Sequence, residues 1–374
     1  MLSDDALARQ TSASSTLKRD ESSTFIPISR VMRPRLRESQ NQSKVNKAIQ
    51  QLRIRLEFPD PDLESIKKHL YILQRWYLSM RPEKREVQAN AFKAGGITLQ
   101  WVWNHNLHLT NAFLNDHEML DYLCVLLVAE KLDDFIVKWL SLPVDARIVG
   151  ELGKGGLTWR GSLWRNLIAA ELSLAVHSRD ATQAIARLLS VYRLKQRFRD
   201  TEDFSPGSVA RMSTFPAKEH LANSITSGAF PHTDPGAYEN LAEFYRGGTL
   251  KTAMEWQYPT LCLWHPTHPD PMPLLQYLRE HSGNIAAGFG GQSDRARHHK
   301  QRQLVRLSRL LHESKMIPDA AWVESLLPPV TQISTTQGMN YAREYNKLKP
   351  PASEKRVPSF TESRHVYQPM DRRA

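Results

Sequence analysis

The sequence predicts an all-α protein, an irregular, α-solenoid-like array of helical hairpins with disordered basic termini. Two observations support this prediction. Apolar residues recur at helical spacing through most of the middle of the 374-residue chain, and no two neighbouring segments show the alternation expected of paired strands. The predicted domains are a disordered N-terminal segment at 1–42, a helical-hairpin domain at 43–328 and a disordered basic tail at 329–374.

Three helices are predicted before the centre of the chain. They cover approximately residues 44–58, 63–81 and 83–93, and prolines separate each helix from the next. Gly95 and Gly96 follow the third helix, at a place where glycine suits the left-handed backbone that often ends a helix. We therefore expect these two glycines to close the third helix.

Two helical hairpins are predicted in the centre. A single helix is expected first, at 97–114, because nothing nearby offers a strand partner. Residues 116–145 then predict two amphipathic helices broken at 130–134, and a second pair is expected at 163–177 and 180–198. Because neither pair can bury both of its apolar faces alone, the pairs are expected to stack on neighbours.

The C-terminal third is predicted to be less regular. Prolines are frequent and helical signals short at 205–273, so we expect irregular structure there with a helix at 237–245. Further helices are expected at 274–281, 293–314 and 318–327.

Two segments resemble a known family of helical hairpins. LCVLLVAEKLDDFIVKWLSLPVD, at Leu123–Asp145, and LIAAELSLAVHSRDATQAIARLLSVYR, at Leu167–Arg193, are similar to pentatricopeptide-type hairpins and also to tetratricopeptide-like ones. The resemblance implies an organellar, RNA-associated helical scaffold. The chain has no regular period, so a code of one base per repeat is not expected. Hairpins of an unrelated α-domain are the alternative.

The charge balance favours polyanionic partners. The chain has 50 Lys+Arg against 39 Asp+Glu, a net charge of +11, and such an excess attracts RNA, DNA or anionic membrane surfaces. The alternative is that the net positive charge serves only solubility and that no polyanion is bound. The longest apolar run, 122–129, is far shorter than the ~20 residues that a membrane-spanning helix needs, so no membrane span is expected.

Two features bear on the compartment. The first ~37 residues are rich in Ser, Thr and Arg, as mitochondrial presequences are, although Asp4 and Asp5 are unusual for such a segment. Cys124 and Cys262 lie in apolar runs, where buried free thiols in a reducing compartment are expected. The prediction is a mitochondrial protein, with nucleus or cytoplasm as the alternative.

The candidate nucleic-acid-binding residues lie mainly on one predicted helix. Arg302, Arg306 and Arg309 fall at i, i+4 and i+7, on a face different from that of the leucines of the same helix. Arg295 and Arg297 extend the charge toward the start of the helix. Such a stripe can line phosphates. The alternative is the solvated face of an ordinary basic protein.

Trp159 and Arg160 are the other candidates for binding nucleic acid. Trp159 follows a glycine-rich break and is therefore expected to be exposed, where an aromatic ring beside an arginine can stack on unpaired bases. The alternative is that this tryptophan belongs to the core.

No catalytic, metal or cofactor site is predicted. The segment His265–Asp270 offers two imidazoles and a carboxylate, but its prolines favour a stiff surface loop. Gly150–Gly156 lacks the Ser or Thr and the preceding strand of a phosphate loop. Gly288–Gly291 lacks the strand that precedes a dinucleotide site.

The sequence therefore predicts a non-catalytic, helical-repeat-like scaffold that binds RNA or a ribonucleoprotein and needs no cofactor. The alternative is a protein–protein interaction scaffold of the nucleus or cytosol that binds no nucleic acid. A third interpretation is an enzyme with an unrecognised site.

Overall fold

The computed structural model describes residues 38–58, 62–142, 159–201, 208–247, 255–281 and 294–327. Within these ranges the chain forms fifteen α-helices and two 3₁₀ helices, and no strand. The predicted all-α class is therefore confirmed. The termini predicted to be disordered lie outside the described residues, apart from residues 38–42, which belong to the first helix.

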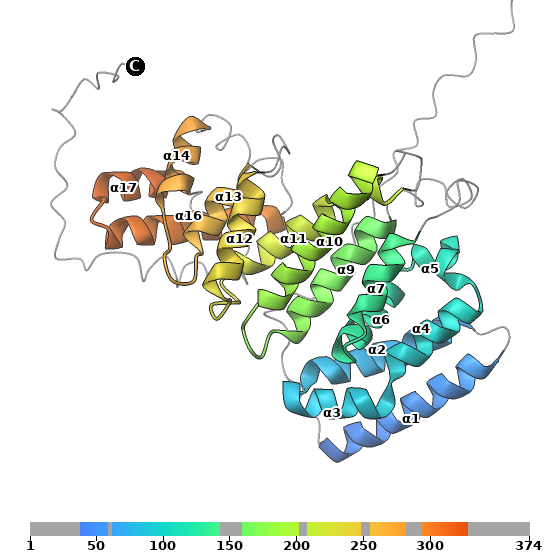
Figure 1. The fold of residues 1–374 in the computed structure, drawn as a ribbon. Coiled ribbons are helices and arrows are strands. Elements are labelled where there is room, and N and C mark those ends of the chain that lie inside the picture. The colour runs from blue at the N-terminus through green and yellow to red at the C-terminus, as the bar shows by residue number, and fades with distance from the viewer. Residues whose placement is uncertain are drawn as a thin grey trace, which may run out of the picture. The chain divides into compact units, whose positions relative to one another are not determined.

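The chain divides into two compact units, Met1–Leu221 and Ala222–Ala374, whose boundary falls inside the helix α11 (Phe215–Ile225). Among the described residues, the first unit contains nine more α-helices and two 3₁₀ helices, some of them paired along the chain (Figure 1). They are α1 (Glu38–Glu57), α2 (Leu63–Ser79), α3 (Pro82–Phe92), α4 (Ala94–Asn104), η2 (Leu107–Leu109), α5 (Asn111–Leu114), α6 (His117–Ala129), α7 (Asp133–Ser141), α9 (Trp159–Leu174) and α10 (Thr182–Thr201), followed by the short η4 (Val209–Arg211).

The centre of the first unit is α6, which packs between α2 and α9, while α1 packs on α2 (Figure 1). Every residue from Leu123 to Leu127 is buried, so this helix is apolar on nearly all sides, as a helix surrounded by others must be. Leu70 of α2 and Leu167 of α9 are buried as well. The predicted central hairpin is thus present as α6 and α7, and its first helix is core.

A buried arginine joins the ends of two helices in this unit. The guanidinium of Arg85, on α3, donates to the carbonyl oxygens of Tyr77 and Met80 at the end of α2 and of Leu174 at the end of α9, each at 3.0 Å. The last carbonyls of a helix have no partner within it and carry the negative end of its dipole. Arg85 therefore supplies both the donors and the charge that these ends need.

The prediction that Gly95 and Gly96 close a helix is wrong. The helix α3 ends instead at Lys93, whose φ of 52° is left-handed, and both glycines lie in the first turn of α4. A Cβ atom on Gly95 would lie 3.0 Å from backbone atoms of Leu126 and Leu127. The glycine is needed for the close approach of α4 to α6.

The prediction of one helix at 97–114 is also wrong in detail. The helix α4 ends at Asn104, and Asn106 adopts a left-handed φ of 54° before η2 and α5. Asparagine tolerates this conformation better than most residues. The break brings the His108 ring against Trp103, with ring centroids 4.5 Å apart.

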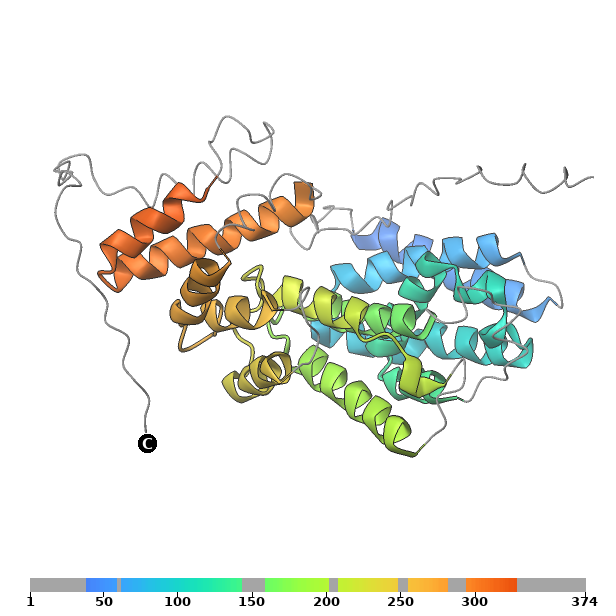
Figure 2. The ribbon, with the colours of Figure 1, turned by 90° about the horizontal axis from the view of Figure 1, so that it is seen from above.

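The second unit contains α12 (Pro235–Arg246), α13 (Gln257–Leu263), α14 (Met272–Glu280), α16 (Asp294–Glu313) and α17 (Ile317–Ser325). Its core is formed by leucines of α14 and α16 with Ala320 and Val323 of α17. Figures 1 and 2 show α16 and α17 side by side, and they form the most extensive helix pair of this unit.

The region 205–273 is more helical than predicted, because α11 and α13 were not expected. Each contains a proline, Pro216 and Pro259, within its first turn. The first amides of a helix have no partner inside it, so a proline there removes no helical hydrogen bond. The prolines of this region therefore start helices as well as interrupt them.

Candidate nucleic-acid interface

The inner face of α16 is core, as predicted. Leu304, Leu307 and Leu311 are fully buried in the cluster that includes Leu274 and Leu278 of α14. The helix has 20 residues, and its only two acids, Asp294 and Glu313, stand at its two ends. The apolar face fixes the rotation of the helix and therefore decides which of its basic side chains point outward.

Three arginines follow one another along the outer side of this helix. Arg302 and Arg309 are exposed, and Arg306 between them is half-buried. Spacings of four and seven residues place them on one side of an α-helix. We call Arg302, Arg306 and Arg309 the α16 arginine row.

The exposed members of the row have weak partners within the protein. Arg309 Nε lies 2.8 Å from Glu313 Oε1 in an exposed ion pair, a kind of contact that contributes little to stability. Arg302 Nη1 lies 3.5 Å from the carbonyl oxygen of Ser227. Both guanidiniums can therefore exchange these contacts for a phosphate at little cost.

Arg306 is held differently from its neighbours. Its guanidinium carbon lies 5.3 Å from the ring centroid of Trp264, and burial, followed by the nearby Arg309, lowers its pKa from the ordinary value. A second cation of α16 has a similar setting, since Lys300 Nζ lies 5.8 Å from the Trp256 ring. Burial lowers the pKa of Lys300 too.

The two remaining predicted arginines of this helix do not join the row. Arg297 is half-buried, and its position five residues before Arg302 places it on a different side of an α-helix. Arg295 lies in α16, but its side chain lies outside the described residues.

The expectation that Trp159 is exposed is wrong. Trp159 and Arg160 are 1% and 3% exposed, because α9 begins at Trp159 and buries its first turn. Arg160 Nε donates to the carbonyl oxygen of Leu140 at 3.0 Å, and a second nitrogen donates to that of Leu142. The guanidinium thus caps the end of α7, and neither side chain is placed to stack on a base.

A small pocket in the second unit is lined in part by the histidines that the sequence singled out. Its volume is about 240 Å³, and its lining comes from α12, α13 and the turn after α13. The lining residues are Glu239, Ala242, Glu243, Tyr258, Cys262, His265, His268 and Asp270.

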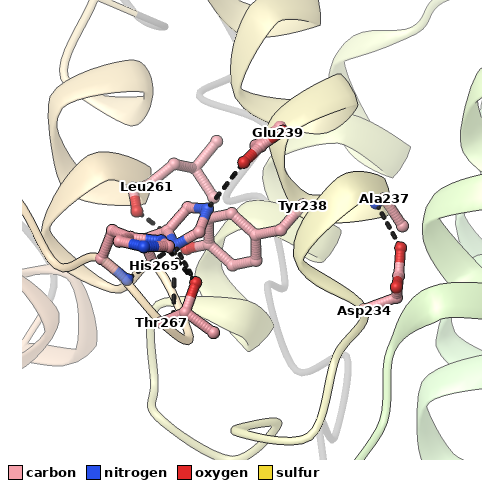
Figure 3. A network of polar contacts seen from close by, with 8 residues as sticks. Asp234, Ala237, Tyr238, Glu239, Leu261, His265 and Thr267 are labelled. Atoms are coloured by element: carbon pink, nitrogen blue, oxygen red, sulfur yellow. Dashed lines mark hydrogen bonds and ion pairs between the residues drawn. The ribbon is translucent and has the colours of Figure 1, made fainter.

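Hydrogen bonds and a ring contact orient His265, which lines the pocket (Figure 3). Nδ1 of His265 accepts from the backbone N–H groups of Thr267 and His268, at 3.3 and 3.0 Å, so the ring proton belongs on Nε2, which lies 3.9 Å from Glu239. Tyr238 packs edge-on against this ring and donates to the Leu261 carbonyl oxygen at 2.8 Å.

Burial affects the titration of one imidazole and one thiol of the pocket. Burial lowers the pKa of His265 and raises the pKa of the Cys262 thiol, so neither carries a charge at neutral pH. A protonated thiol is a poor nucleophile and a poor metal ligand. Among the residues that the structure describes, no group of three or more His, Cys, Asp and Glu side chains is arranged to hold a metal ion.

The two glycine-rich segments that the sequence analysis set aside, 150–156 and 288–291, lie outside the described residues. Comparison with known proteins leaves the family open: no family model, no curated protein and no solved structure matches this chain. None of the described helices has the length and apolar character needed to cross a membrane.

No sequence pattern revealed the aromatic partner of the row, Trp264. Trp264 was not connected to Arg306 because the two are far apart in sequence. The available signal was the number of tryptophans in this region, Trp256 and Trp264 within the same proline-rich stretch. Tryptophan is the ring on which a cation packs best.

Proposed function

We propose that this protein is a non-catalytic helical scaffold that binds single-stranded RNA, alone or within a ribonucleoprotein, through the α16 arginine row. One observation carries the proposal. The inner face of α16 is locked into the core, while Arg302 and Arg309 stand exposed on its outer side with Arg306 between them.

The charge distribution along the helix supports this function. Between its terminal acids α16 carries only basic and neutral residues. The one carboxylate of this helix that pairs with the row, Glu313, does so in an exposed ion pair with Arg309 that a bound phosphate can replace. Each phosphate that an arginine neutralises releases condensed counterions, which makes binding favourable at low salt and weaker as salt increases. Contacts of this kind fix position and carry little sequence information.

The scaffold part of the proposal rests on the helical pairs. The pairs α6–α7, α9–α10 and α16–α17 are each formed by helices that follow one another and pack together. A repeat-like array of such pairs offers extended surfaces for partners. The proposal also includes a mitochondrial location, on the basis of the composition of the first residues. The location of a fluorescent fusion protein in cells tests it.

The test is a binding titration with a matched control. A labelled oligouridylate of about 12 nucleotides is titrated with the full chain at low salt, and anisotropy is recorded. The row variant carries Arg302→Gln, Arg306→Gln and Arg309→Gln. The control variant removes three positive charges too, but from exposed positions of α1. It carries Lys44→Gln, Lys47→Gln and Arg55→Gln.

We expect the row variant to bind at least tenfold more weakly than wild type and the α1 variant to lie within about threefold of wild type. Equal losses in both variants would mean that net charge, and not the row, attracts RNA. Absence of binding by wild type would leave the protein–protein scaffold as the better account.

A further inference from the structure

The indole of Trp264 is oriented by a hydrogen bond to a side chain that is itself held by a second hydrogen bond. Its Nε1 donates to Oε1 of Gln303, one helical turn before Arg306 on α16. Gln303 is fully buried, and its Nε2 donates to the carbonyl oxygen of Thr226 at 3.0 Å. Both polar ends of the Gln303 amide are thus satisfied, and the orientation of the ring follows from them.

A glycine makes room for this ring. Gly228 has a φ of 75°, and a Cβ atom added to it would lie 2.4 Å from Cζ3 of Trp264. Both facts favour glycine at this position, because a side chain would be strained in its backbone conformation and would collide with the indole. The ring therefore lies close to both the turn at Gly228 and the side chain of Arg306.

The guanidinium of Arg306 packs against the Trp264 ring. Its Nε is buried without a hydrogen-bond partner among the described residues. A buried donor without a partner costs free energy, and burial disfavours the charge itself. A ligand that supplies a negative charge beside the guanidinium would offset the second of these costs.

We propose that Trp264 holds Arg306 as the anchor for a phosphodiester, so that this arginine contributes more to binding than Arg302 or Arg309. A guanidinium fixed in one plane presents its remaining N–H groups as a fork that matches two phosphate oxygens. Less side-chain entropy is lost on binding, since the stacking has already ordered the side chain. Arg302 and Arg309, which are exposed, act as flanking charges.

This inference rests on the proposed function, and its first test keeps the charge constant. Arg306→Lys and Arg302→Lys are compared with wild type in the oligouridylate titration. Lysine retains the charge but has no planar fork, so we expect Arg306→Lys to weaken binding about tenfold and Arg302→Lys to change it less than about twofold. Equal effects of the two substitutions would overturn the anchor.

A double-mutant cycle tests whether Trp264 acts through Arg306. We expect Trp264→Leu to weaken binding about as much as Arg306→Lys does. The affinity of the double variant should lie within about twofold of that of either single variant, because both changes remove the same contact. Additive losses would overturn the role of Trp264. Thermal unfolding of each variant identifies one that does not fold, in which case the Arg306→Lys and Arg302→Lys comparison decides.

Inorganic polyphosphate distinguishes failure of the anchor from failure of the RNA proposal. Wild-type binding to polyphosphate but not to RNA, with a loss in Arg306→Lys, would support the anchor and overturn RNA as its ligand. Wild-type binding to RNA with no loss in Arg306→Lys would overturn the anchor and leave the proposed function standing. Binding to neither would overturn both.

Discussion

The carboxylate of Glu130 accepts a hydrogen bond from the backbone N–H of Gly95 at 2.7 Å, and the adjacent N–H of Gly96 donates to the same carboxylate at 2.8 Å. These amides belong to the first turn of α4 and have no partner inside the helix. Glu130 comes from the turn after α6, so this contact joins two parts of the first unit and places a buried acid at the positive end of a helix dipole.

Gly95→Ala is expected to destabilise the protein by about 1–3 kcal/mol, because the new methyl group would press on backbone atoms of α6 that cannot move aside. The measurement is the midpoint of thermal unfolding. Gly247→Ala is the control: its added Cβ would meet its nearest atom at an ordinary 3.6 Å, and a change within about 0.5 kcal/mol is expected. Equal stability of wild type and Gly95→Ala would show that α4 and α6 are not this close.

Glu130 makes stability depend on pH. Burial, partly opposed by the hydrogen bonds from the glycine amides, raises its pKa from 4.5 to about 7. The folded state thus retains a proton that the unfolded chain releases, so the contribution of Glu130 is complete below pH 4.5 and is lost as the pH rises to about 7. The loss is at most about 3 kcal/mol.

Glu130→Gln removes this titration. Between pH 5 and 7.5 we expect the melting temperature of wild type to fall further than that of the variant, because glutamine has no carboxyl group that titrates. Burial also raises the pKa of Glu171 to about 7, so Glu171→Gln should flatten the same part of the curve. A wild-type curve parallel to that of Glu130→Gln would contradict the assignment.

Leu126→Ala should cost roughly 2–5 kcal/mol, because Leu126 is fully buried in the central helix of the first unit. Val87→Ala on α3 is the matched control, since Val87 is 65% exposed, and little change is expected. Chemical denaturation monitored by circular dichroism measures both. A Leu126→Ala variant as stable as wild type would mean that α6 is not core.

Arg160→Met separates stability from RNA binding. The substitution leaves the carbonyl oxygens of Leu140 and Leu142 without their donor, so we expect a loss of about 1–3 kcal/mol in stability. The affinity of the folded variant for oligouridylate should equal that of wild type, because the guanidinium is buried. Weaker binding without any loss of stability would restore Arg160 as a binding residue.

The parts of this fold that the sequence predicted correctly are the ones encoded locally. Helical spacing of apolar residues predicted α16 and its buried face at Leu304, Leu307 and Leu311, all of which are buried. The spacing also placed Arg302 and Arg309 on another side of the helix, where both are exposed. Periodicity is sufficient for such inferences because it depends on one helix at a time.

The errors arose where the outcome depends on distant residues. Lys93 and Asn106 adopt left-handed backbone conformations, which sequence patterns assign to glycine first. Trp159 is buried because α9 begins there and packs on other helices. Trp264 and Gln303, which are 39 residues apart, form the support for Arg306, and no local pattern indicates that contact.

The salt dependence of RNA binding tests the central claim most directly. The slope of log affinity against log salt is measured for wild type and for the variant with Arg302→Gln, Arg306→Gln and Arg309→Gln. Each lost contact with a single strand should reduce the slope by about 0.7, or about 2 for the whole row, while the melting temperature stays close to that of wild type because the leucine face is untouched. The account is contradicted by a variant that retains the wild-type affinity and slope, or by a wild-type protein that binds no RNA at low salt.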